Sequence, residues 1–372
     1  MERRGFIKNL MAATALSSLP STALFSNTIQ ERQTTGNKDL IWANLIHLST
    51  NMWEDNPHIK WPGVSCEVYK DDFECKTRLD AIAWGMRAYR PFLVFDEPLW
   101  NKILHDMVKA GFNMVIIDLG DAIQYQSHPE IAITNAWSID KLKTELVKIR
   151  QLGLEPIPKL NFATSHDTWL GEYHRMVSTR KYYAVCGDLI SEVIELFDTP
   201  RFFHIGMDEE DYKNQVQYRY ATVRQGDLWW KDFYFFVDQV EKKGVRSWIW
   251  SDYGWHYPDA FFKKMPKSVL QSNWYYDVQF GDLTGLEESH KTRYNMYYEL
   301  EKHGYDQVPT GSNFNNNVNM EGTVRHFKNV IDPSRLLGFM SAPWLPTMPQ
   351  CAASHKEAIE QLGRAKKEFM SK

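Results

Sequence analysis

The sequence has few cysteines, no concentrated basic stretch and no segment with the length and apolarity of a transmembrane helix. Its four cysteines show no spacing typical of a metal site, and they are too few to define a disulfide framework in a chain of 372 residues. The 43 Lys and Arg residues are mixed with 47 Asp and Glu residues, and the resulting net charge of -4 argues against a nucleic-acid partner. We therefore predict a protein with no membrane span, no nucleic-acid partner and no bound metal or cofactor.

The sequence also lacks a phosphate-binding glycine loop after any predicted strand, which argues against a dinucleotide-binding fold. Aromatic residues, in contrast, make up 14% of the chain and include 14 Trp and 18 Tyr. Aromatic faces stack on the apolar C–H faces of sugar rings, so this excess favours a carbohydrate ligand. An aromatic-rich core explains the composition equally well, and composition does not separate the two.

The N-terminus resembles a twin-arginine export signal. Arg3 and Arg4 are followed by an apolar pair and a lysine, and then by an apolar stretch that ends near Phe25. We predict that residues 1–38 are an export signal and linker and that the protein is periplasmic; the N-terminus of a cytosolic protein is the alternative. Oxidising conditions after export would allow Cys66 and Cys75 to form a disulfide.

Short apolar runs alternate with longer amphipathic segments from residue 39 onward. We predict strands at 40–48, 112–119, 154–160, 202–206, 245–250, 268–274, 307–312 and 336–341. We predict helices at 97–110, 138–152, 181–197, 228–243, 287–303, 322–330 and 355–370, with Ser138 as the cap of the second. This alternation of eight strands with helical segments predicts an α/β fold, a single (β/α)8 TIM barrel over residues 39–372 with a long first loop at 49–95.

Three consecutive acids follow the fourth predicted strand. The strand leads into Gly206, where the backbone can turn, and then into Asp208, Glu209 and Glu210. Adjacent carboxylates at the end of a buried strand repel each other and lose hydration, so we expect the pKa of at least one to rise. A protonated carboxyl beside an ionised one is what cleavage of a glycosidic bond requires. A solvated acidic loop is the alternative.

The C-terminal ends of the predicted strands carry polar and aromatic residues together. In a (β/α)8 barrel these ends form the active site, where amides and carboxylates can bind hydroxyls and Trp can wall a sugar pocket. We predict Asp208 and Glu209 as catalytic residues. The predicted substrate-binding residues are Asp118, Asp121, His166, Trp250, Asp252, Trp274, Tyr275, Asn313 and Trp344.

Residues 204–209 (HIGMDE) resemble the His-x-Gly-x-Asp-Glu motif that ends the fourth strand of glycoside hydrolase family 20, the β-N-acetylhexosaminidases. The resemblance extends over roughly residues 100 to 350. Residues 111–121 are similar to the second strand of that family, 245–252 to the fifth, 272–274 to the sixth and 337–344 to the eighth.

This resemblance implies an exo-acting, retaining glycosidase that removes a terminal N-acetylhexosamine or related sugar. Glu209 would protonate the glycosidic oxygen and later deprotonate the incoming water. The acetamido oxygen of the substrate would attack the anomeric carbon, and Asp208 would orient that group. Two adjacent acids would then suffice without a separate enzymatic nucleophile.

The sequence departs from the family pattern at three strands. A Pro-Gly-His is usual after the third strand, whereas residues 158–166 read PKLNFATSH, in which His166 is the candidate counterpart. The Tyr-x-Asp of the seventh strand is replaced by residues 313–315 (NFN). The Arg of the first strand has no counterpart other than Arg90.

Two other functions remain open at this stage. A metal-dependent sugar isomerase or epimerase would use Asp208, Glu210, His166 and Asp252 as ligands. A barrel that has lost its chemistry would bind carbohydrate without turnover.

Overall fold

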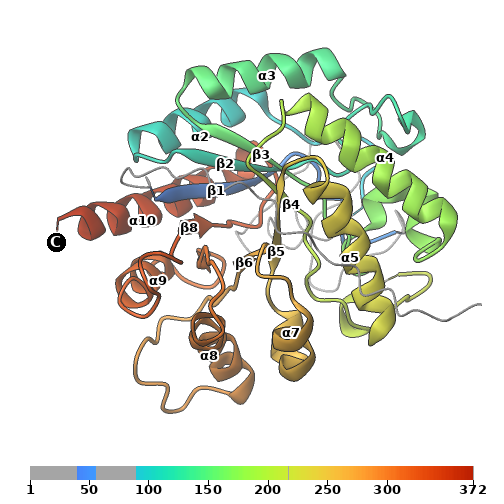
Figure 1. Ribbon diagram of the computed structural model, residues 1–372. Helices are drawn as coiled ribbons and strands as arrows, with labels where there is room; N and C mark the ends of the chain where they lie inside the picture. Colours follow the sequence, from blue (N-terminus) through green and yellow to red (C-terminus); the bar gives the residue numbers. More distant parts are fainter. Residues whose placement is uncertain (1–39, 56–88, 217, 372) are drawn as a thin grey trace, which may run out of the picture. The chain divides into compact units, whose positions relative to one another are not determined.

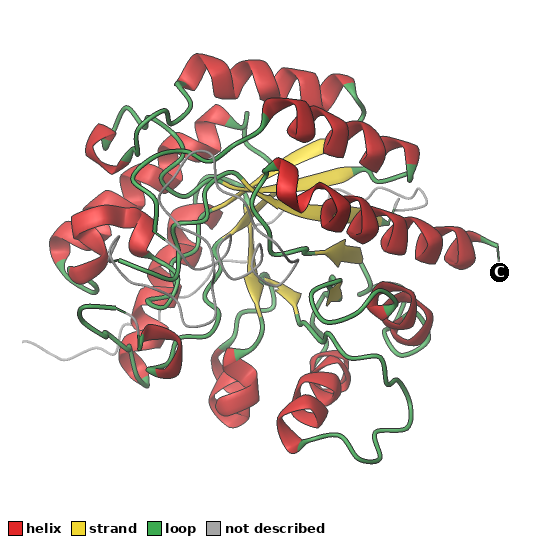
Figure 2. Cartoon of the chain, turned by 180° about the vertical axis from the view of Figure 1, so that it is seen from behind, coloured by secondary structure: helices red, strands yellow, loops and turns green. Residues whose placement is uncertain are grey.

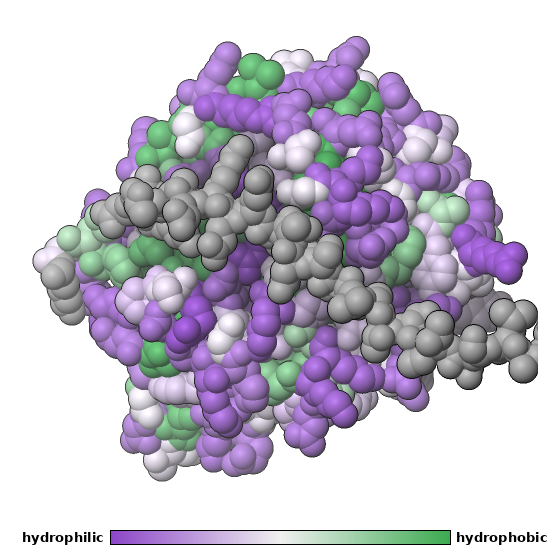
Figure 3. Space-filling model, viewed as in Figure 1, coloured by the Kyte–Doolittle hydropathy of each residue, from purple (hydrophilic) through white to green (hydrophobic). Residues whose placement is uncertain are grey.

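We describe residues 40–55, 89–216 and 218–371 of a computed structural model (Figure 1). The predicted export signal, Cys66, Cys75 and most of the first loop lie outside these residues. None of the described helices is long and apolar enough to span a bilayer. The face shown in Figure 3 is mainly hydrophilic, with apolar residues scattered between the polar ones.

Eight parallel strands form one sheet in the order β6-β5-β4-β3-β2-β1-β8-β7. They are β1 (Ile41–His47), β2 (Met114–Asp118), β3 (Glu155–Lys159), β4 (Phe202–His204), β5 (Arg246–Trp250), β6 (Leu270–Ser272), β7 (Thr310–Gly311) and β8 (Gly338–Ser341). The edge strands meet through bridges at Gln271–Gln307 and Trp274–Thr310. The sheet therefore curls into the predicted (β/α)8 barrel.

Prolines weaken two of the strand pairings. Pro156 and Pro158 lie within β3 and have no N–H to donate, and β3 pairs with β4 only at Lys159 and His204. Pro309 immediately precedes β7, which is two residues long rather than the six that were predicted. The shortened strands leave irregular backbone at the rim of the barrel, where the pocket described below is located.

Helices surround the strands (Figure 2). They are α2 (Glu97–Lys109), α3 (Ile139–Gln151), α4 (Arg180–Leu196), α5 (Asp227–Glu241), α6 (Tyr253–His256), α7 (Pro258–Lys264), α8 (Glu288–Lys302), α9 (Asn319–Phe327) and α10 (Ala352–Met370). The predicted cap of α3 is confirmed, because the Ser138 side chain accepts a hydrogen bond from the N–H of Lys141 at 3.2 Å.

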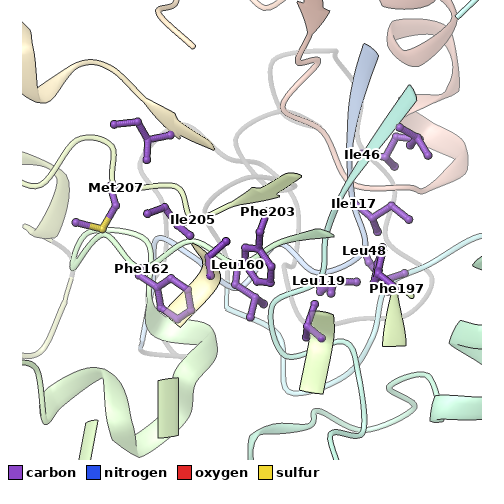
Figure 4. Close-up of a cluster of buried hydrophobic side chains, with 14 of the residues drawn as sticks. Ile46, Leu48, Ile117, Leu119, Leu160, Phe162, Phe197, Phe203, Ile205 and Met207 are labelled. Carbon is purple, nitrogen blue, oxygen red and sulfur yellow. The ribbon is translucent and has the colours of Figure 1, made fainter. Parts of the chain in front are cut away.

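The alternation of side chains along each strand divides the core in two. Inside the barrel lie Ala43 and Leu45 of β1, Ile116 of β2 and Ile157 of β3. Side chains on the other face of the strands, and in the segments just after β3 and β4, belong to a second buried cluster that includes helix residues. Figure 4 shows part of this cluster, with Ile46, Ile117, Leu160, Phe162, Phe203, Ile205 and Met207. The same alternation turns the last residues of several strands toward the barrel axis, beneath the pocket.

Candidate active site

A pocket of about 320 Å³ opens at the C-terminal ends of the strands. Its walls come from the loops that follow most of the strands, as expected for this fold. The lining residues are Trp53, His166, Asp208, Glu209, Lys213, Asn214, Val216, Trp274, Tyr276, Arg293, Phe314, Asn315 and Trp344. Five of the predicted site residues therefore meet in one cavity: His166, Asp208, Glu209, Trp274 and Trp344.

An unusual backbone turn after β4 directs both predicted catalytic acids to this pocket. Gly206, Met207 and Glu209 all have positive φ angles, of 71°, 74° and 52°. The Met207 side chain packs into the outer core, whereas Asp208 and Glu209 both line the pocket. Neighbouring residues of a regular strand would point in opposite directions, so the strained turn is what brings the two acids together.

Asn161 fixes this turn and Asp208. Its Nδ2 donates to Oδ1 of Asp208 at 2.8 Å, while its Oδ1 accepts from the N–H groups of Met207 and Ala163, both at 3.1 Å. A Cβ atom on Gly206 would lie 2.0 Å from Asn161 Oδ1, so only glycine allows this approach. Asp208 is 5% exposed and is held before any ligand arrives.

Glu209 faces the pocket more openly than Asp208. Its side chain is 34% exposed, and its Oε2 lies 3.4 Å from Nε2 of His166. The other nitrogen of His166 lies 3.6 Å from Oδ1 of Asp208. Burial lowers the pKa of His166, but the carboxylates of Asp208 and Glu209 outweigh burial and raise this pKa above its ordinary value. The imidazole therefore bridges the two acids.

Asp252 supports the acid pair from the fifth strand. The N–H of Glu209 donates to Oδ2 of Asp252 at 2.7 Å. Burial, followed by the charge of Asp208, raises the pKa of Asp252 well above its ordinary value. The sequence predicted a raised carboxyl pKa within the adjacent acids, and the structure assigns one to this third carboxyl, which lies beside them but does not line the pocket.

The third consecutive acid is turned away from the pocket. Glu210 pairs with the buried guanidinium of Arg224, with its Oε2 2.6 Å from Nη2, and Arg224 also contacts Asp232 at 3.2 Å. Glu210 is therefore an internal counter-ion. This corrects the expectation that it could join Asp208 and His166 as a metal ligand.

Asp118 and Trp250 lie under the pocket rather than in its wall. Asp118 is 2.5 Å from Nζ of Lys159 and 3.1 Å from Nδ1 of His47. Burial alone would raise the pKa of Asp118, but Lys159 and His47 lower it to about 2. Trp250 is fully buried, with its ring 5.7 Å from that of Trp344. The inward alternation of the strands explains both positions, because the pocket begins one layer above.

Asp121 and Arg90 hold the base of the first loop. Asp121 accepts from Ser49 Oγ at 2.5 Å and from Asn51 Nδ2 at 2.8 Å, and burial raises its pKa to about 7. Arg90, the sequence-level candidate for a sugar-binding arginine, is buried and donates to Thr50 Oγ1 at 2.7 Å. Neither residue lines the pocket.

Two predicted residues are displaced from the wall by one or two positions. Tyr275 is buried and donates to the carbonyl of Gln279 at 2.7 Å, whereas Tyr276 lines the pocket and stacks on Trp274 with centroids 5.1 Å apart. Asn313 is likewise buried, and its amide donates to the carbonyl of Ser354 at 2.9 Å, whereas Asn315 lines the pocket. The sequence contained a signal for Tyr276, because it lies two positions after the predicted residue Trp274, and residues two apart face the same side of an extended chain.

Other wall residues had no such signal in the sequence. They come from irregular loops or from the side of a helix: Trp53, Lys213, Asn214, Val216, Arg293 and Phe314. Trp53 packs edge-on against His166, with ring centroids 5.4 Å apart. Trp344 donates from Nε1 to the hydroxyl of Tyr276 at 2.9 Å. Aromatic rings thus close several sides of a cavity that holds two acids.

Comparison with known proteins identifies the fold. No family model matches the sequence, and no curated protein matches it. A chitobiase from Flavobacterium johnsoniae has a TM-score of 0.52 at 15% identity, over 74% of this chain and 50% of that one. Dispersin B has a TM-score of 0.52 at 16% identity, over 73% of this chain and 95% of that one. A Streptomyces plicatus β-hexosaminidase mutant in complex with its product GlcNAc has a TM-score of 0.50 at 12% identity, over 72% of this chain and 60% of that one.

These similarities confirm the fold that the family resemblance implied. The chain spans half the length of the chitobiase, so the similarity to that enzyme concerns the barrel. Fold and site together define a (β/α)8 barrel with an acid pair in an aromatic pocket at the C-terminal ends of its strands.

Proposed function

We propose that this protein is an exo-acting, retaining glycoside hydrolase that removes a terminal N-acetylhexosamine or a related sugar. The observation that carries the proposal is the pair Asp208 and Glu209, turned into one aromatic pocket by the strained backbone after β4. The similarity in fold to a chitobiase and a β-hexosaminidase supports this substrate class.

The two acids have different surroundings, and these suit different roles. Glu209 is partly exposed in the pocket, where its proton can pass to the glycosidic oxygen as the bond to the anomeric carbon breaks. The acetamido oxygen of the substrate forms the new bond to that carbon, and Asp208 binds the acetamido N–H. Glu209 then takes a proton from water as water opens the cyclic intermediate, which restores the acid.

His166 and Asp252 prepare this pair without reacting themselves. His166 lies between the two carboxylates and balances their charge. Asp252 fixes the main chain of Glu209 through its hydrogen bond to the N–H. Trp274, Tyr276 and Trp344 supply ring faces for the sugar.

The experiment uses the purified full chain and chromogenic glycosides with and without a 2-acetamido group. The expected result is hydrolysis of the acetamido substrates only, with inhibition by an N-acetylglucosamine thiazoline. Hydrolysis restricted to sugars without the acetamido group would rule out substrate assistance. If the protein is a glycosidase, Glu209→Gln should lose turnover and keep its affinity for the sugar. If the protein only binds carbohydrate, the substitution should leave its sugar binding unchanged.

A metal-dependent sugar isomerase is the second candidate. One possible ligand atom from each of His166, Asp208 and Glu209 lies within 4.8 Å of the others. Carboxylate oxygens and an imidazole suit several divalent ions. Loss of activity on an aldose in EDTA, restored by Mg²⁺ or Mn²⁺, would favour this candidate over hydrolysis.

We also propose export through the twin-arginine pathway. Replacement of Arg3 and Arg4 by Lys should retain the protein in the cytoplasm, as measured by cell fractionation. Unchanged export would contradict this localisation.

A further inference from the structure

Arg293 supplies a guanidinium to the wall of the pocket. It comes from the side of α8, and its Cζ lies 4.8 Å from the ring centre of Trp274 and 5.1 Å from that of Trp255. Stacking on indole rings holds a guanidinium in one plane and leaves its N–H edges able to bind an oxyanion. The position of this charge is thus set by aromatic contacts.

No carboxylate within the described ranges forms an ion pair with Arg293. Asp277, in the loop that precedes α8, is 2.7 Å from Nδ1 of His290 and so has another partner. Two cations outside the lining, Lys159 and Arg175, are each paired with a carboxylate, Lys159 with Asp118 and Arg175 with Asp55. A guanidinium in the wall of a pocket, with no carboxylate partner among the described residues, is available to pair with an anionic group of a ligand.

Arg293 and the acid pair belong to the same cavity. Tyr276 lines this cavity as well: it stacks on Trp274 and accepts a hydrogen bond from Trp344. Burial raises the pKa of Tyr276, Glu209 and Asp208 add to this increase, and Arg293 opposes it, so all three charged groups act on one phenol. Lys213 adds a second cation to the lining. A sugar placed at Glu209 would therefore present its substituents to a cationic part of the wall.

We propose that the pocket takes a sugar that carries an oxyanion, a sulfate ester or a carboxylate, and that Arg293 binds this group. The inference rests on the proposed glycosidase function and specifies its substrate class. A guanidinium donates two parallel hydrogen bonds to either group, which makes Arg293 a specificity residue. A neutral sugar would leave this charge without a partner.

The experiment compares 4-methylumbelliferyl 2-acetamido-β-glucoside with its 3-, 4- and 6-O-sulfates and with the analogue whose C6 is a carboxylate. Each is tested on the wild-type chain, on Arg293→Gln and on Arg293→Lys. Arg201→Gln is the matched control, because Arg201 lies at the opposite end of the barrel and pairs with Glu155. Titration of the corresponding free monosaccharides by calorimetry measures binding without turnover.

The expected result is a kcat/KM for one anionic substrate roughly 10-fold or more above that of the neutral parent. Arg293→Gln should remove this preference, Arg293→Lys should restore part of it, and Arg201→Gln should leave it unchanged. Comparison of the O-sulfated substrates with the C6 carboxylate analogue identifies which oxyanion is bound.

Equal or better turnover of the neutral parent would overturn the inference and leave the glycosidase function standing. The inference is also overturned, and the glycosidase function again stands, if Arg293→Gln keeps the preference for the anionic substrate. If no glycoside is hydrolysed, the proposed function fails and calorimetry decides the inference. Tighter binding of an anionic sugar that depends on Arg293 then supports it, and equal binding of neutral and anionic sugars refutes it.

Discussion

The backbone N–H of Glu209 donates a hydrogen bond to Oδ2 of Asp252 across 2.7 Å. This bond links the loop after β4 to the end of β5 at the residue with a φ angle of 52°, a conformation that non-glycine residues rarely adopt. A carboxyl group that does not line the pocket thus holds the main chain of the proposed acid in place.

We expect Asp252→Asn to retain most activity and Asp252→Leu to lose it. The raised pKa of Asp252 favours its neutral form, which an asparagine resembles, and the amide oxygen can still accept from Glu209 N–H. Leucine removes the acceptor and releases the turn, so kcat should fall roughly 100-fold. Steady-state kinetics on an acetamido substrate measure this. Equal losses in the two variants would show that Asp252 acts through its charge.

Glu209→Gln should reduce kcat roughly 100- to 10,000-fold, because it removes the proton that the leaving group needs. Substrates with leaving groups of low pKa, such as dinitrophenol, need less protonation and should be affected less. The exposed Glu172→Gln is the matched control for a lost carboxylate. Near-normal activity of Glu209→Gln on a poor leaving group would exclude the residue as the acid.

His166 should make stability depend on pH. Its pKa is raised in the folded protein, so its contribution is fully present below the unfolded pKa of about 6.5 and is lost as pH rises through the folded pKa. The difference in unfolding free energy between wild type and His166→Gln should therefore shrink from pH 6 to pH 9. Urea titrations at several pH values measure it, with His105→Gln on α2 as control. A difference that grows with pH would contradict the assigned sign.

Gly206→Ala should destabilise the protein and abolish activity. The new Cβ would lie 2.0 Å from Asn161 Oδ1 and 2.8 Å from Asn161 Cα, on a backbone with φ of 71°. Asn161 would have to move and would release Asp208, so we expect a loss of about 3 kcal/mol or more.

Gly153→Ala is the matched control for this prediction. Gly153 also has a positive φ, of 81°, but nothing lies within 4 Å of the added atom. The Gly153→Ala variant should lose only about 1 kcal/mol of unfolding free energy, because alanine is strained at a positive φ, and its kcat and KM should stay unchanged. Similar losses at both glycines would show that the contact with Asn161 is unimportant.

The periodic parts of the sequence predicted the barrel well. Apolar alternation located all eight strands to within a few residues, and the capping role of Ser138 was visible in the sequence. These features depend on residues close together in the chain. The acid pair could be recognised for the same reason, since Gly206, Asp208 and Glu209 are local to one turn.

What the sequence determined by itself is thus the fold and the position of the acid pair. The tertiary structure decided the rest: that Glu210 is neutralised by Arg224, that Asp118 lies beneath the pocket, and that Tyr276 and Arg293 complete its wall. Local periodicity reports which way a residue faces within its own element. The distances among Glu209, Asp252 and Arg293 depend on how separate strands and helices are brought together by closure of the barrel.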